Sequence, residues 1–343
     1  PGVAPGADLI FVHLCGDDTA PEDTLGDSVR LLEAVDYVVN RAAGRPLVIN
    51  LSVGRTGDSK DGTSPVERAL DHVSESAPGR VVCISTGNYF RSRLHASGRV
   101  DQDRKTVLRW RVPAHRPRPA ELEIWYGHAD EFIFELEPPG ESGKVSVPLG
   151  ATKVLRRRGE ITASIYHRRD DPNNGDHLIN VFLYPAAVTG QWRIGLRGVV
   201  VSDGGFHAWI ERESPQHQSR VHRDDVDPSV SLGTLVAGRR TISCAAYDAR
   251  DKRNRIAPFS SSGPTRDGRE VPVLAAPGVA IRAACSTYFD ALGFRITDKT
   301  VSKSGTSMAA PHVAGTAALM MAAAQRPLYA AQIREILIDT AKE

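Results

Sequence analysis

Residues 304–315 read SGTSMAAPHVAG, and no other stretch of the chain is as informative about its fold. Glycine at 305 lets the backbone turn sharply before a helix, and the small residues that follow let that helix pack closely. A serine at position 307 would lie beside the unpaired N–H groups of the helix N-terminus, which suits a nucleophile whose product is an oxyanion. For the Gly-x-Ser element alone, a plain N-cap serine is the competing interpretation.

The whole string closely resembles the serine motif of the subtilases, the subtilisin-like serine proteases. Other blocks resemble that family in the order the family requires. Gly2–Leu9 is similar to the segment that follows the family's histidine motif, and Val48–Gly54 is similar to the strand that lines the substrate cleft. Val81–Asn88 looks like the strand that ends in the oxyanion asparagine. Phe259–Thr265 and Ala276–Val279 resemble the stretch before the serine motif.

This resemblance implies roles for particular residues. Ser307 would be the acyl-forming nucleophile, and Asn88 would hold the oxyanion together with the Ser307 backbone N–H. For Asn88 alone, a turn residue after glycine is the simpler interpretation. The resemblance also implies two substrate-binding segments, Leu51-Ser52-Val53-Gly54 as a strand edge and Ser85-Thr86-Gly87 as a pocket wall.

The chain departs from the family in one respect that bears on activity. A subtilase also needs an aspartate in an Asp-Thr-Gly-type motif and a histidine in a His-Gly-Thr-His-type motif, and this sequence contains neither. We therefore expect the catalytic base and its carboxylate upstream of Pro1. Surface or packing roles are predicted for His13, His72, His95 and His312.

From this departure we predict that the chain alone is not a competent protease. Its partners would be a peptide or protein substrate and an associated upstream fragment that carries the catalytic Asp and His. A pseudoprotease or peptide-binding module, which keeps the cleft but only holds a partner, is the alternative. Asp and His motifs in the upstream coding sequence would support the enzyme.

The order of strand-like and helix-like patterns predicts an α/β body with a mostly parallel sheet and flanking helices. Ala7–Leu14, Leu47–Leu51 and Arg80–Ser85 alternate with helical spacing around Leu31–Val39 and Val66–Val73. The same pattern returns at Thr241–Ala246, at Val271–Ala275 and in two C-terminal helices. We predict a first body segment over residues 1–104, an insert over 105–211 and a second body segment over 212–343.

The insert has short alternating runs separated by Pro, Gly, Asn and Asp, which predict an antiparallel β-sandwich or jelly roll. It resembles the jelly-roll insertion of some subtilases, including the clostridial germination proteases. All four tryptophans fall in it, at Trp110, Trp125, Trp192 and Trp209. A core role is favoured over a glycan- or protein-binding role, in which exposed tryptophans would stack on sugars. Asp170–Asp176 is interpreted as a polar turn, with a calcium loop as the alternative, and Arg156–Arg158 as a solvated basic turn.

Composition excludes several other classes of protein. The 343 residues carry 43 Lys plus Arg against 41 Asp plus Glu, so no overall field favours nucleic acid or an anionic membrane. No apolar run approaches the length of a membrane span. Cys15, Cys83, Cys244 and Cys285 are interpreted as buried free thiols. No cofactor or metal is required. The resemblance allows calcium without naming ligands, and it favours secretion, whereas unpaired cysteines favour a reducing interior.

Overall fold

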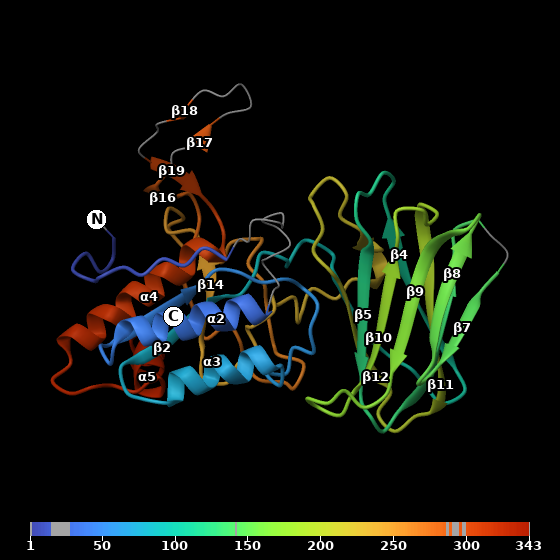
Figure 1. The fold of residues 1–343 in the computed structure, drawn as a ribbon, viewed down its shortest axis with the longest axis horizontal. Coiled ribbons are helices and arrows are strands. Elements are labelled where there is room, and N and C mark those ends of the chain that lie inside the picture. Colours follow the sequence, from blue (N-terminus) through green and yellow to red (C-terminus); the bar gives the residue numbers. More distant parts are fainter. Residues whose placement is uncertain are drawn as a thin grey trace.

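The structure is a computed structural model that describes residues 2–14, 28–140, 143–285, 288–289, 295–296 and 300–342. An α/β body and an all-β unit lie side by side, and the chain passes from the body into the β unit and back again (Figure 1). Among the described residues, no helix combines the length and apolar character needed to cross a bilayer.

A four-stranded parallel sheet forms the centre of the α/β body. Its order is β1 (Leu47–Leu51), β2 (Arg80–Ser85), β14 (Ile242–Tyr247) and β15 (Leu274–Pro277). Because β14 pairs with β2, residues from either side of the β unit meet in one sheet. Because β1 and β2 pair in parallel, their carboxyl ends lie at the same edge of the sheet. Loops at this edge of parallel sheets commonly form binding sites.

Helices cover both faces of this sheet. On one face lie α4 (Thr306–Ala323) and α5 (Ala330–Thr340), which bury small and aliphatic side chains against β2, β14 and β15. On the other face lie α2 (Ser28–Ala42) and α3 (Pro65–Glu75). The Ser64 hydroxyl caps α3 and Pro65 is its first residue, which needs no backbone donor.

The β unit consists of two antiparallel sheets that share one core, and we call it the β-sandwich. The first sheet has the order β3 (His95–Arg99), β12 (Gly205–Ile210), β5 (Ala120–Tyr126), β10 (His177–Leu183), β9 (Glu160–Arg168) and β8 (Thr152–Arg157). The second has the order β13 (Arg220–Val221), β4 (Lys105–Val112), β11 (Gly190–Val200), β6 (Glu131–Glu137) and β7 (Val145–Pro148).

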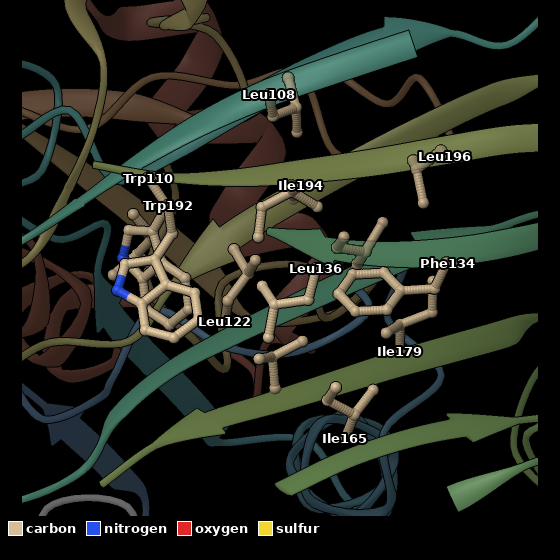
Figure 2. Packing of buried hydrophobic residues seen from close by; sticks show 14 of the residues in the cluster. Leu108, Trp110, Leu122, Phe134, Leu136, Ile165, Ile179, Trp192, Ile194 and Leu196 are labelled. Carbon is tan, nitrogen blue, oxygen red and sulfur yellow. The ribbon is translucent and has the colours of Figure 1, made fainter. Parts of the chain in front are cut away.

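Side chains from both sheets interdigitate in the sandwich core. Figure 2 shows Leu108, Ile194 and Leu136 from one sheet facing Leu122 and Ile179 from the other. All four tryptophans are buried, with exposed fractions of 6% or less. Trp110 and Trp192 lie in the sandwich core as predicted, whereas Trp125 and Trp209 form a separate buried cluster with Leu178 and Val230. None of the four is an exposed platform for a sugar.

The described body and sandwich differ from the sequence predictions in several places. Ala7–Leu14 forms no strand, because no described strand pairs with it, and Leu9 and Phe11 remain 92% and 87% exposed. His95 is buried in β3, which pairs with β12, although the sequence around it predicts no strand. Arg156 and Arg157 end strand β8, and only Arg158 and Gly159 form the turn.

The sandwich strands also extend beyond residues 105–211. β3 and β13 join its two sheets from residues 95–99 and 220–221. Short polar segments of this kind have no alternating apolar signal, so their pairing is decided by the neighbouring strand. The thiols of Cys83 and Cys244 are free and buried, Cys285 is half-buried, and Cys15 lies outside the described residues.

The remaining described elements are short. A 3₁₀ helix, η1, spans Arg223–Asp225. An arm above the body contains the antiparallel pairs β16 (Ile281–Ala284) with β19 (Thr300–Lys303), and β17 (Tyr288–Phe289) with β18 (Arg295–Ile296) (Figure 1).

Candidate active site

Ser307 lies in the first turn of α4, which begins at Thr306 with Gly305 as its N-cap. Thr306 and Gly305 are buried, whereas Ser307 is half-buried. Gly305 has no side chain to cap the helix, and two of the first N–H groups already have partners: that of Thr306 donates to the Asn88 side-chain oxygen and that of Met308 to the Gly305 carbonyl. The partial positive charge of these groups would favour an anion formed at the serine.

Asn88 contacts the residue before Ser307. Its side-chain oxygen accepts a hydrogen bond of 2.9 Å from the Thr306 backbone N–H. Because an N–H can only donate, this bond fixes which end of the carboxamide is oxygen. The Asn88 NH₂ group is thereby turned away from Thr306 and is the end available to donate to a substrate oxygen.

The segment between β2 and Asn88 is tied to α4 and to β14. The Gly87 N–H donates to the Thr306 hydroxyl at 3.0 Å, and the Thr86 hydroxyl donates to the Cys244 carbonyl at 3.2 Å. Gly87 has a φ of +101°, which favours glycine. The predicted pocket wall, Ser85-Thr86-Gly87, thus leads directly from the end of β2 into the asparagine.

The second predicted substrate segment contacts Ser307 itself. β1 ends at Leu51, and the Ser52 hydroxyl then donates to the Ser307 carbonyl at 3.2 Å. Ser52, Val53 and Gly54 are half-buried. Gly54 has a φ of +144° and lies against Thr234, where an added Cβ would come within 3.0 Å of the Thr234 hydroxyl. The structure therefore brings Leu51–Gly54, Ser85–Gly87, Asn88 and Ser307 into one neighbourhood, while their roles stay predictions.

No general base is present beside the serine in the part of the chain that the structure describes. There, the Ser307 hydroxyl has no hydrogen bond to a histidine or a carboxylate. His312 bonds through Nδ1 to the Met308 carbonyl at 2.9 Å, within its own helix. His13 and His72 are exposed, and His95 lies in the sandwich. All four histidines therefore occupy packing or surface positions.

Buried charges behind the Leu51–Gly54 segment were not predicted from the sequence. Lys60 is 1% exposed and Glu67 is 1% exposed. Burial, with the nearby Asp58 charge, raises the pKa of Glu67 to about 8. Burial, with the charges of Glu123 and Glu211, raises the pKa of Glu121 to about 7. These residues lie in strands and loops whose sequences show no motif. No local pattern therefore predicts that their charges are buried.

The segment Asp170–Asp176 contains a turn, as predicted. Across the described ranges, no three His, Cys, Asp or Glu side chains are arranged to hold a metal ion. The turn is closed by backbone bonds between Asp171 and Gly175 and between Asp171 and Asp176. Its Asn174 donates to Asp61 of the body at 2.8 Å. The turn therefore serves as a contact between sandwich and body.

Comparisons with known proteins point to one family. The sequence model described as the subtilase family, Peptidase S8, matches residues 169–343. The serine protease AprX of Bacillus subtilis is 42% identical over 101 residues, which are 27% of this chain and 23% of that protein. The subtilisin-like protease SBT3.6 of Arabidopsis thaliana is 42% identical over 90 residues, 25% of this chain and 11% of that protein. The chain thus spans less than a quarter of each of these two relatives.

A solved structure is similar over most of the chain. The CspB protease of Clostridium perfringens superposes with a TM-score of 0.77 at 22% identity, over 92% of this chain and 65% of that one. At this identity the similarity concerns the fold. It matches the α/β body together with the antiparallel sheets.

Proposed function

Because the chain belongs to the subtilase family of serine peptidases, we propose that it carries the nucleophile and oxyanion site of a serine endopeptidase. Ser307 is the proposed nucleophile and Asn88 the proposed oxyanion donor. The observation that carries this proposal is the hydrogen bond from the Thr306 N–H to the Asn88 side-chain oxygen. It ties the carboxamide to the residue next to the serine.

The proposed reaction is acyl transfer. The Ser307 hydroxyl oxygen attacks the carbonyl carbon of the scissile peptide bond, and its proton passes to a histidine base. The resulting oxyanion accepts hydrogen bonds from the Asn88 NH₂ and the Ser307 backbone N–H. The C–N bond then breaks, the amine leaves with the proton from the histidine, and water hydrolyses the ester.

The substrate is proposed to bind as an extended peptide. Leu51 forms the last residue pair of β1, with Ile84, and Ser52–Gly54 continue beyond it, which supports pairing of this backbone with a peptide strand. Ser85–Gly87 would form a wall of the pocket for the side chain before the cleaved bond. Protein substrates follow from the family, whereas the preferred sequence is not specified by these residues.

The Asp and His of the triad are proposed to lie upstream of residue 1, on a segment that stays associated with this chain. The absence of a base beside Ser307 in the described residues supports this division. Without the base, residual catalysis by binding and the oxyanion hole is about 10³- to 10⁴-fold over water, a magnitude taken from subtilisin itself. The proposed reaction uses no cofactor and no nucleic acid. In the described ranges, no three His, Cys, Asp or Glu side chains are arranged to hold a calcium ion, and we propose no calcium ligand.

We further infer that the β-sandwich is a jelly-roll-like insertion between two body segments, with the predicted bounds of 105–211 widened by β3 and β13, which pair with its strands. The pairing of β2 with β14 supports this division, since it closes one sheet from both body segments.

Hydrolysis of a protein substrate tests the proposed function. The 343-residue chain, and the same chain extended by its upstream coding sequence, are incubated with fluorescein-labelled β-casein. We expect cleavage by the extended protein and none by its Ser307→Ala variant. Equal cleavage by the Ser307→Ala variant would show that Ser307 is not the nucleophile.

A further inference from the structure

The β-sandwich holds the segment that directly follows the proposed substrate-binding strand. Three consecutive backbone amides, those of Thr56, Gly57 and Asp58, donate to two sandwich carboxylates. Glu211 accepts from the Thr56 N–H at 3.1 Å and from the Gly57 N–H at 2.9 Å. Glu123 accepts from the Asp58 N–H at 2.9 Å. Amide bonds to a charged acceptor are stronger than bonds between neutral groups.

The two carboxylates are themselves fixed within the sandwich. Glu123 lies in β5, where its carboxylate also accepts from the Trp125 indole at 3.1 Å and from the Asn180 amide at 3.3 Å. Glu211 directly follows β12 and is 6% exposed. Their positions are therefore set by the pairing of β12 with β5 rather than by the loop they hold.

The fit between the carboxylates and the loop is close. An added Cβ at Gly57 would lie 3.0 Å from the Glu123 carboxyl carbon and 3.1 Å from a Glu211 carboxylate oxygen. Thr56 is 1% exposed, and its hydroxyl donates to the Ile210 carbonyl at 2.7 Å. The loop backbone is thus enclosed by the sandwich at this point, and a side chain at position 57 would require the two carboxylates to shift.

A short stretch of backbone connects this contact to Ser307. The Arg55 N–H donates to the Thr234 hydroxyl at 2.9 Å, and the Thr234 N–H donates to the Arg55 carbonyl at 2.9 Å. The Ser52 hydroxyl donates to the Ser307 carbonyl. The proposed substrate strand is therefore held by the β1–β2 pairing before it and by Thr234 and the sandwich carboxylates after it.

We propose that Glu211 and Glu123 are positioning residues that set the conformation of Leu51–Gly54 for binding an extended peptide. This inference rests on the proposed function, because it assigns the sandwich a part in substrate recognition by that same site. The carboxylates touch no substrate. They act through the amides of Thr56–Asp58 and the backbone between those amides and Ser52.

Two measurements on the full 343-residue chain test this role. Peptide binding is measured as the fluorescence anisotropy of fluorescein-labelled β-casein in the Ser307→Ala background, where no cleavage can occur. Hydrogen exchange followed by mass spectrometry reports the protection of residues 52–58 separately from that of the sandwich strands. Glu211→Gln and Glu123→Gln keep the size of each side chain and remove its charge.

Glu121→Gln is the matched control. Glu121 lies in β5, two residues before Glu123, but its contact with this segment is an Arg55 ion pair with an N–O distance of 3.9 Å. We expect Glu211→Gln and Glu123→Gln to weaken casein binding about tenfold and to speed exchange at residues 52–58 by a similar factor, with Glu121→Gln unchanged. Exchange of the sandwich strands should stay at the wild-type rate in Glu211→Gln and Glu123→Gln.

Other results would contradict the proposal. Casein binding at wild-type strength, despite faster exchange at Thr56–Asp58, would show that the contact only docks the sandwich. Should Glu211→Gln fail to fold, Gly57→Ala displaces the same loop from the body side and must give the same loss of binding. If the wild-type chain binds no casein, the proposed function fails for this chain. Unchanged exchange at residues 52–54 in Glu211→Gln would then separately overturn the positioning role.

Discussion

The Asn88 side-chain oxygen accepts a 2.9 Å hydrogen bond from the backbone N–H of Thr306, although 218 residues separate the two in sequence. The Thr306 hydroxyl in turn accepts the Gly87 N–H. These two bonds join the segment after β2 to the start of α4, one through Gly87 and one through the asparagine side chain itself. The orientation of the carboxamide beside Ser307 is therefore a property of the folded body and needs no substrate to establish it.

Asn88→Ala tests the proposed oxyanion donor. In the protein extended upstream, we expect kcat to fall about 10²- to 10³-fold with little change in KM, the loss seen when such a donor is removed from subtilisin itself. Asn40→Ala, on the exposed side of α2, is the control and should leave kcat unchanged. A loss confined to KM would assign Asn88 to ground-state binding.

Gly87→Ala tests the conformation that leads into Asn88. The added Cβ would lie 2.8 Å from the Tyr89 ring at a backbone φ of +101°. We expect the free energy of unfolding to fall by roughly 1–3 kcal/mol, measured by urea denaturation. Gly140→Ala, at φ +68° with no atom within 4 Å of the new Cβ, separates backbone strain from the clash and should cost less. If both variants lose the same free energy of unfolding, the contact with Tyr89 contributes nothing to the loss in Gly87→Ala.

The acidic contact between body and sandwich predicts a loss of stability at alkaline pH. Burial raises the folded pKa of Glu121 to about 7 from an ordinary 4.5, with further contributions from the charges of Glu123 and Glu211. A raised carboxyl pKa means that the folded protein binds the proton more tightly. Its stabilising contribution is therefore complete below pH 4.5 and is lost as pH rises through 7.

Glu121→Gln should remove this dependence, because glutamine stays neutral at every pH. We expect the variant to exceed the wild-type free energy of unfolding at pH 8.5 by roughly 1–3 kcal/mol, with the difference shrinking toward pH 5. Urea denaturation at both pH values measures it. A difference that does not change with pH would contradict a raised pKa at this position.

The histidine stack in the sandwich predicts a second pH effect with the opposite sign. His95 Nε2 lies 3.0 Å from His207 Nδ1, and both rings stack with Trp209. Burial lowers the pKa of His95 to about 4 and that of His207 to about 3. Their stabilising contribution is present above the ordinary value of 6.5 and is lost as pH falls toward 3 to 4.

NMR titration of the imidazole Cε1 protons measures this directly. We expect the His95 and His207 signals to keep the shift of the neutral ring down to about pH 5.5, while the histidine of an unstructured model peptide in the same tube titrates near 6.5. Protonation of either ring at pH 6 in the folded protein would contradict the stack as described.

Most of what could be predicted about the candidate site from the sequence alone comes from residues 304–315. Gly305 before a serine, followed by small residues, predicts a helix with a reactive N-terminus, and α4 begins at Thr306. Ser64-Pro65 likewise predicts the start of α3. Such local signals succeed because capping and backbone freedom depend on residues close in sequence.

Relationships between distant residues could not be predicted in this way. Thr56–Asp58 carries no motif, and Glu123 and Glu211 resemble any polar position in a strand. Only the docking of the sandwich against the body places two carboxylates on three consecutive amides. The strand predicted at Ala7–Leu14 shows the same limit, because its apolar residues meet no described strand that could pair with them.

Covalent labelling by a fluorophosphonate probe, located by peptide mass spectrometry, tests the central claim most directly. The probe reacts with serine hydroxyls that a base and an oxyanion hole activate. We predict rapid labelling at Ser307 in the chain extended upstream, slower labelling in its Asn88→Ala variant and little in the 343-residue chain alone. Rapid labelling at a different serine, or an equal rate at Ser307 with Asn88 replaced, would contradict the account.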